Sequence, residues 1–177
     1  MGLDQEIIRT TKKRLAAIQD YNSKLEILHN WESELYNRPD VKSLIENLPK
    51  SGCQYDYDKY TEQQNDEIER LNNLYLDKAK EIGISIRNDS VYFDEARYGL
   101  GEDDTTYLIE DFRKEWPLHQ FIVDNFWDAS KDDNLIEIPL QKESLEKLIE
   151  HGFFPDVFRN ALSMIDDTHC IYYWAWY

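Results

Sequence analysis

Two adjacent cations and a histidine form the densest group of potentially reactive side chains in this sequence. Arg113 and Lys114 are neighbours, and His119 follows shortly after them. Guanidinium and ammonium groups match the oxygen atoms of phosphates and carboxylates. These three residues therefore predict a site that binds or hydrolyses a nucleotide or another phosphoester. A structural explanation competes with this one, because the cations can pair with carboxylates such as Glu110, and Glu115 can meet His119 one helical turn later.

The remaining candidates for chemistry are carboxylate pairs and isolated nucleophiles. Adjacent aspartates could bind a hard cation, but adjacent side chains do not converge on one face and no calcium-loop pattern occurs. His169 beside Cys170 lacks the other members of a zinc site or catalytic triad. We therefore predict no metal and no cofactor, and the sequence gives no positive support for an enzyme. The aspartate pairs are Asp103/Asp104, Asp132/Asp133 and Asp166/Asp167.

Net charge is the strongest global feature. The 177 residues include 36 Asp and Glu against 20 Lys and Arg, a net charge of −16. A field of this sign repels nucleic acid and anionic lipid, so a protein partner with a basic surface is the expected one. Acidity that only maintains solubility is the competing explanation. The candidate partner-binding residues, in two acidic segments, are Tyr55, Asp56, Tyr57, Asp58, Glu102, Asp103 and Asp104.

The elements that must position these residues begin with two long amphipathic helices. Apolar residues recur at steps of three and four over residues 11–36 and again over 61–82. A loop signal separates the helices, so an antiparallel helical hairpin is predicted over residues 11–83. Its apolar stripes could serve internal packing, or the hairpin could be an arm that reaches a partner or a second copy of the chain.

The second half of the chain predicts a small sheet covered by helices. A helix is expected over 107–127, begun by Asp104 or Thr105 and kinked or restarted at Pro117. Strands are expected at 135–140 and at the aromatic C-terminus, joined by a strand from residues 2–8 or 84–93. The predicted fold is therefore α+β, a single domain over 1–177 with its core in 105–177.

Composition supports a folded protein of a reducing compartment. Hydrophobic residues make up 41% and aromatic residues 14% of the chain, which is too much apolar surface for global disorder. Cys53 and Cys170 are far apart and form no CxxC pattern, so no disulfide framework is expected. No apolar run is long enough to cross a membrane, and a cytoplasmic location is expected.

Several short motifs, taken in order, resemble a family of small bacteriophage and prophage proteins of unknown function. Members begin MGLD and carry an RK…(I/L)H element, an aspartate pair and an aromatic C-terminal strand with two tyrosines. This chain differs in having Asn134 where members have a cysteine, and in an enlarged segment over 12–105. The matching motifs are Met1–Asp4, Arg113-Lys114, Leu118-His119, Asp132-Asp133, Ile136–Ile149, Gly152–Phe154 and Tyr172-Tyr173.

The resemblance and the charge together give the functional expectation. The resemblance implies a phage-encoded accessory protein in the bacterial host cytoplasm, and the acidity implies a basic target. The main hypothesis is therefore an inhibitor of a host defence or nucleic-acid-handling protein that imitates a polyanion. The alternative is the small-ligand protein that uses Arg113, Lys114 and His119. Self-association through the long helices is a third possibility.

Overall fold

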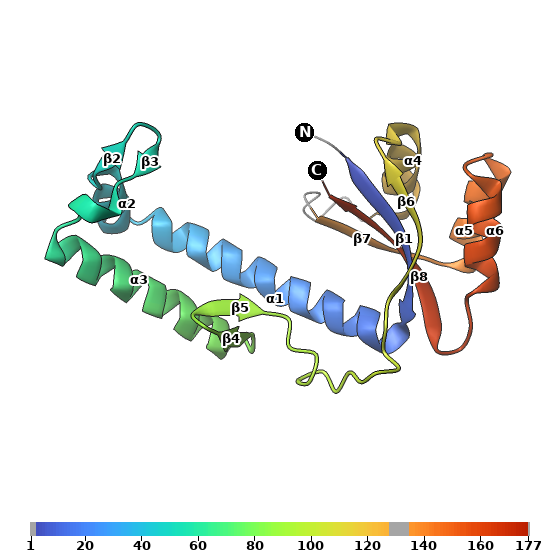
Figure 1. Ribbon diagram of the computed structural model, residues 1–177, viewed down its shortest axis with the longest axis horizontal. Helices are drawn as coiled ribbons and strands as arrows, with labels where there is room; N and C mark the ends of the chain where they lie inside the picture. The colour runs from blue at the N-terminus through green and yellow to red at the C-terminus, as the bar shows by residue number, and fades with distance from the viewer. Residues whose placement is uncertain (1–2, 128–134, 177) are drawn as a thin grey trace. The chain divides into compact units, whose positions relative to one another are not determined.

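The computed structural model describes residues 3–127 and 135–176. The chain forms two compact units, which are treated separately here (Figure 1). The first unit joins Met1–Ala16 to Ala96–Tyr177, and the second is the intervening segment Ala17–Glu95. Helices and antiparallel strands are both abundant, so the predicted α+β class is confirmed.

The first unit contains one four-stranded antiparallel sheet of order β6-β1-β8-β7. The N-terminal strand β1 is central, so of the two alternatives predicted for this strand, residues 2–8 or 84–93, the first is the one that joins the sheet. The edge position of β7 agrees with Pro139, which has no N–H to donate to a further strand. The four strands are β1 (Asp4–Thr11), β6 (Tyr107–Arg113), β7 (Leu135–Leu140) and β8 (His169–Trp176).

Three helices pack on one face of this sheet, called here the inner face (Figure 1). They are α4 (Trp116–Phe126), α5 (Lys142–Glu150) and α6 (Pro155–Ser163). Alternate residues of the strands point to these helices because side chains alternate between the two faces of a strand. The resulting core holds the fully buried side chains Leu3, Ile7, Leu118, Ile122, Leu145, Leu148, Phe158, Ile171 and Tyr173.

The predicted helix over 107–127 is wrong in its first half. Residues 107–113 form strand β6, and helix α4 begins only at Trp116, with Glu115 rather than Asp104 or Thr105 at its N-cap. Pro117 lies in the first turn, where its missing N–H costs nothing, so the helix begins at Trp116, where the sequence predicts a kink or restart of a longer helix. An irregularity opposite Ile7 and Ile8 breaks the alternation of β6, which hides the strand from a periodicity search.

The second unit is built on α1 (Lys12–Tyr36), which starts in the first unit, and α3 (Glu62–Glu81). These spans confirm the two predicted long helices. Leu28 of α1 packs with Ala79 of α3, and Leu35 packs with Leu71. Thr61 begins α3 with a capping box, since its hydroxyl accepts from the Gln64 N–H while the Gln64 side chain accepts from the Thr61 N–H.

Short elements complete the second unit. Helix α2 (Pro39–Glu46) follows α1, and the small hairpin β2 (Lys50–Ser51) with β3 (Gln54–Tyr55) leads into a 3₁₀ turn, η1 (Tyr57–Lys59). A second hairpin pairs β4 (Ser85–Arg87) with β5 (Ser90–Tyr92). Its two turn residues, Asn88 and Asp89, have φ of 50° and 56°, the left-handed conformation that a tight hairpin turn requires. Residues 84–93 therefore form this separate hairpin and not a strand of the main sheet.

Candidate partner-binding surfaces

The two predicted anion-binding cations lie at the surface, at the end of an edge strand. Arg113 is the last residue of β6, its side chain is 83% exposed, and its Nε lies 3.9 Å from the Asp4 carboxylate. Lys114 follows with a φ of 60°, and its backbone N–H donates to the Leu3 carbonyl at 2.9 Å. This bond fixes the turn between the strand and helix α4.

His119 lies on the other side of that turn, inside the core. Its side chain is buried on α4, and its Nδ1 lies 2.7 Å from the Tyr173 hydroxyl. The Tyr173 hydroxyl donates to the Gln5 side-chain oxygen at 2.9 Å. This chain of hydrogen bonds ties α4 to two central strands. The buried imidazole and the exposed Arg113 guanidinium do not converge on one ligand.

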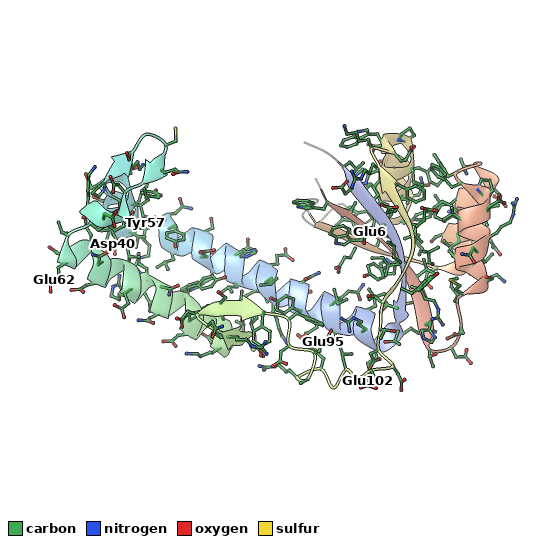
Figure 2. All side chains as sticks on the ribbon, viewed as in Figure 1. Glu6, Asp40, Tyr57, Glu62, Glu95 and Glu102 are labelled. Carbon is green, nitrogen blue, oxygen red and sulfur yellow. The ribbon has the colours of Figure 1, made fainter. Side chains whose placement is uncertain are left out.

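The segment Tyr55–Asp58 presents an aromatic ring and a carboxylate to solvent. Tyr57 is 72% exposed and is labelled in Figure 2, and Tyr55 is 38% exposed. Asp58 is exposed as well, whereas the Asp56 carboxylate is 18% exposed and pairs with Lys59 at 2.7 Å. Of the four residues predicted here, Tyr55, Tyr57 and Asp58 are therefore exposed to a partner, and Asp56 is mostly covered.

The acidic loop before β6 divides into two exposed carboxylates and one that holds the fold. Glu102 and Asp103 are exposed. Asp104 accepts from the Gly101 N–H at 3.0 Å and from the Thr11 hydroxyl at 2.7 Å, and these bonds lower the pKa of its carboxyl. Asp104 therefore anchors the loop to the start of α1, and little of its side chain remains exposed to a partner.

Local ion pairs neutralise most cations of the second unit. Residues 17–95 contain 17 acidic and 9 basic side chains, which leaves a net charge of −8. Six of the nine cations pair with a carboxylate no more than four residues away, and such pairs leave the excess carboxylates on the surface. The pairs are Lys24–Asp20, Arg38–Asp40, Lys59–Asp56, Arg70–Glu67, Lys78–Glu81 and Lys80–Asp77.

A further surface, which the sequence did not predict, is the face of the main sheet opposite α4, α5 and α6, called here the outer face. Directly opposed residues of antiparallel strands share a face. Asp111 is paired with Glu6, Glu6 with Trp174, and Trp174 with Glu137. One row across all four strands therefore places a tryptophan between carboxylates, and Trp176, in the next row, is 55% exposed.

The row on the other side of Trp174 is apolar. Leu108, Ile8, Tyr172 and Pro139 stand opposite one another on the four strands. Leu15 of α1 packs on Ile8 and Tyr172, while Leu108 is 49% exposed. Leu15 thus covers one end of the outer face, which beyond it carries Trp174, Trp176 and carboxylates together with Arg113.

The environment of Tyr172 reflects this arrangement. Burial, followed by the negative charges of Glu137 and Glu6, raises the pKa of Tyr172 to about 12. The negative charges of Glu137 and Glu6 therefore also reach Tyr172, which lies in the neighbouring apolar row. The alternation of residues along 135–140 and 171–177, read for both faces of the strands and not only for the core, would have been a signal for this surface.

The described residues offer no centre for metal chemistry. Nowhere in residues 3–127 and 135–176 do three potential metal ligands come together, and the Asp132/Asp133 pair lies outside these ranges. Asp166 instead accepts from the Thr168 N–H, the Thr168 hydroxyl and the His169 ring, which together hold the pKa of its carboxyl far below the usual range. No helix in those ranges is long and apolar enough for a membrane span.

Comparison with known proteins gives no relative from which a function could be transferred. Neither a protein-family model, nor a curated protein, nor a solved structure matches the chain.

Proposed function

We propose that this protein binds another protein through a basic surface of that partner, as a phage-encoded inhibitor of a host defence or nucleic-acid-handling factor. The observation that supports the proposal best is the exposed pair Tyr57 and Asp58 in a unit with a net charge of −8. An aromatic ring supplies contact area at low entropic cost, and excess carboxylates steer a cationic partner into place.

The second unit suits the role of a binding arm. Helices α1 and α3 pack through Leu28 with Ala79 and through Leu35 with Leu71, an order that makes them antiparallel. They form the helical hairpin of this proposal, and the segment between them carries Tyr57. Because the hairpin cations are mostly paired locally, the surface that a partner meets is dominated by carboxylates spaced along helices, which can occupy a groove built for phosphates.

A salt-controlled capture experiment tests this function. The full chain is immobilised, incubated with bacterial lysate at low ionic strength, and eluted with rising NaCl. We expect a basic protein, eluted between roughly 0.1 and 0.5 M NaCl, because the Debye length is about 10 Å at 0.1 M and shortens further as salt rises. Recovery of no basic protein at low salt would contradict the proposal.

Matched variants separate a specific surface from bulk charge. Replacing Tyr57 by Ser and Asp58 by Lys removes the exposed ring and reverses one charge, whereas Glu150→Lys reverses one exposed charge at the end of α5, in the first unit. We expect the double variant to lose the captured protein and Glu150→Lys to retain it. Equal retention by both variants would show that the segment Tyr55–Asp58 is not the binding site.

A further inference from the structure

One edge of the main sheet is open to a further strand. β6 pairs with β1 on one side, and in the part of the chain that the structure describes no strand pairs with its other side (Figure 1). The opposite edge strand, β7, contains Pro139, which has no N–H to offer a neighbour. β6 is seven residues long and contains no proline, so its edge is the one that can extend the sheet.

The backbone of β6 directs two of its N–H groups away from the sheet. The Lys114 N–H donates to the Leu3 carbonyl at 2.9 Å, on the β1 side. Because successive residues of an antiparallel strand alternate in the side to which their N–H groups point, those of Arg113 and Asp111 point away from β1. The Asp111 N–H donates instead to the carboxylate of the preceding residue, Glu110, at 3.3 Å. A main-chain carbonyl of an added strand would replace this local bond.

Exposed apolar side chains gather at the same edge. Among the described residues of the first unit, five large apolar side chains are exposed, and two of them begin β6, Tyr107 at 57% and Leu108 at 49%. A third, Phe154, has its ring centre 4.6 Å from that of Phe112 in β6. Neighbouring residues of a strand point to opposite faces, so Tyr107 and Leu108 offer apolar contact on both faces of an added strand. The other two are Trp116 and Trp176.

A shallow groove lies beside the first residue of this edge. It has a volume of about 420 Å³ and is lined by Tyr107, Arg9 and residues 163–166. The Arg9 guanidinium is already held there, since its Nε donates to the Met164 carbonyl at 3.1 Å and it pairs with Asp166 at 3.4 Å. An incoming side chain therefore meets the Tyr107 ring and the apolar side chains of 163–166, which suits an apolar residue of the added strand.

The charges of β6 decide between a second copy and a basic partner. Glu110 and Asp111 lie in the middle of the strand, and Glu6 stands opposite Asp111. Antiparallel pairing of β6 with the β6 of a second copy over its full length would set Glu110 opposite itself, and like charges opposite each other destabilise a sheet. Arg113, on the same strand, lies against Asp4. Within residues 3–127 and 135–176, neither Glu110 nor Asp111 forms an ion pair, so basic residues on an added strand have carboxylates to meet.

We propose that β6 binds an extended segment of a partner protein as a fifth strand of the main sheet, with two adjacent basic residues opposite Glu110 and Asp111 and an apolar residue opposite Tyr107. In this mode of recognition main-chain hydrogen bonds supply affinity, and side chains that alternate between the two faces supply specificity. The site lies in the first unit and includes no residue of the segment Tyr55–Asp58, so it stands or falls independently of the proposed function.

Binding of a defined peptide to the full chain tests the proposal. The probe is a fluorescein-labelled peptide with two adjacent lysines between stretches of alternating valine and threonine, followed by fluorescence anisotropy at about 50 mM NaCl. The control peptide has the same sequence and charge but carries methyl groups on its central amide nitrogens, so it cannot donate as a strand. We expect the methylated peptide to bind at least about tenfold more weakly. Equal affinity of the two peptides would overturn the proposal, as would no binding of the unmodified peptide up to about 1 mM.

Two variants at one position separate the backbone from the charge. Asp111→Pro removes an N–H that points away from β1, a change that an edge strand tolerates, and Asp111→Asn removes the same charge but keeps the N–H. We expect Asp111→Asn to weaken binding of the unmodified peptide about twofold to fivefold, and Asp111→Pro to weaken it about tenfold beyond that. Equal weakening by the two variants would show that the peptide binds by charge without pairing.

The wild-type protein gives a readout that does not depend on the folding of a variant. Exchange of its backbone amide hydrogens is measured by NMR with and without the unmodified peptide. We expect the outward N–H groups of Asp111 and Arg113 to exchange at least about tenfold more slowly in the complex, and that of Phe112, which points to β1, to change little. Unchanged exchange of Asp111 and Arg113 at peptide saturation would refute the pairing. A dimer that sedimentation velocity detects without peptide, and that Asp111→Pro abolishes, would also refute the proposal, because a second copy would then be the occupant.

Discussion

At the scale of single residues, the buried chain from His119 through Tyr173 to Gln5 is the feature with the clearest energetic consequence. Tyr173→Phe removes the hydroxyl that hydrogen-bonds to His119 and Gln5. It leaves the buried His119 Nδ1 and Gln5 Oε1 without this partner. We expect a loss of about 1–3 kcal/mol in the free energy of unfolding, the usual cost of such an unmade bond. Chemical denaturation measures it, and Tyr107→Phe, at a 57% exposed position, is the control with no expected change.

Asp166 gives a pH-dependent prediction at the same scale. Its carboxyl pKa is depressed in the folded protein by bonds from Thr168 and His169, so it stabilises the fold at every pH above its ordinary value of 3.8. That contribution is lost as pH falls below 3.8 toward the folded-state pKa. Asp166→Ala should therefore lower the melting temperature at pH 7, and by less at pH 2.5. Asp167→Ala, exposed and without these bonds, should have little effect at either pH.

The sequence was informative about which residues are exposed and poorly informative about which residues converge. The alternating segment Tyr55–Asp58 was predicted as a possible exposed loop, and Tyr57 is indeed well exposed. Arg113 and His119 were grouped because they are close in sequence, but a left-handed residue and a new helix between them send one to solvent and the other into the core. Burial of a histidine depends on a tyrosine 54 positions later, which no local pattern reveals.

At the scale of elements, the junction between β6 and α4 depends on the backbone of Lys114. A φ of 60° disfavours residues with a side chain, most of all β-branched ones, by about 1–2 kcal/mol. Lys114→Gly should therefore stabilise the protein or leave it unchanged, and Lys114→Val should destabilise it by about that amount. Denaturation of both variants measures the difference. Equal stability of the glycine and valine variants would contradict the left-handed turn.

Elements with regular periodicity were predictable, and those with a broken pattern were not. Helices α1 and α3 carry apolar stripes at helical spacing, and Thr61 with Gln64 marks the start of α3, so both appeared within one residue of their observed bounds. Strand β6 has an irregularity opposite Ile7 and Ile8, so its apolar residues do not alternate and suggested a helix instead. Only its pairing with β1, more than 90 residues earlier, decides its conformation.

At the scale of the whole molecule, the acidic charge is shared equally between the two units. Each has a net charge of −8, so self-repulsion is a property of the entire chain and not of one segment. Raising NaCl from about 0.01 to 0.15 M should raise the melting temperature by roughly 2–4 °C, equivalent to about 1 kcal/mol. Near pH 4.6, where the sequence is isoelectric, the response to salt should vanish. A persisting response there would indicate a nonspecific salt effect.

The division into two units predicts that the first folds without the second. Its two segments are joined where the chain leaves and returns, because the Arg14 guanidinium donates to the Asp104 carbonyl at 2.8 Å and the Thr11 hydroxyl to the Asp104 carboxylate. All four strands of the main sheet and the three helices on it belong to this unit. A chain in which a short glycine-serine linker replaces Ala17–Glu95 should therefore be monomeric, unfold cooperatively, and keep the Trp174 indole signal of the full chain. Exchange of the β1 and β8 amide hydrogens within seconds would instead show that the second unit is required for the sheet, since strands at the centre of a stable core exchange slowest.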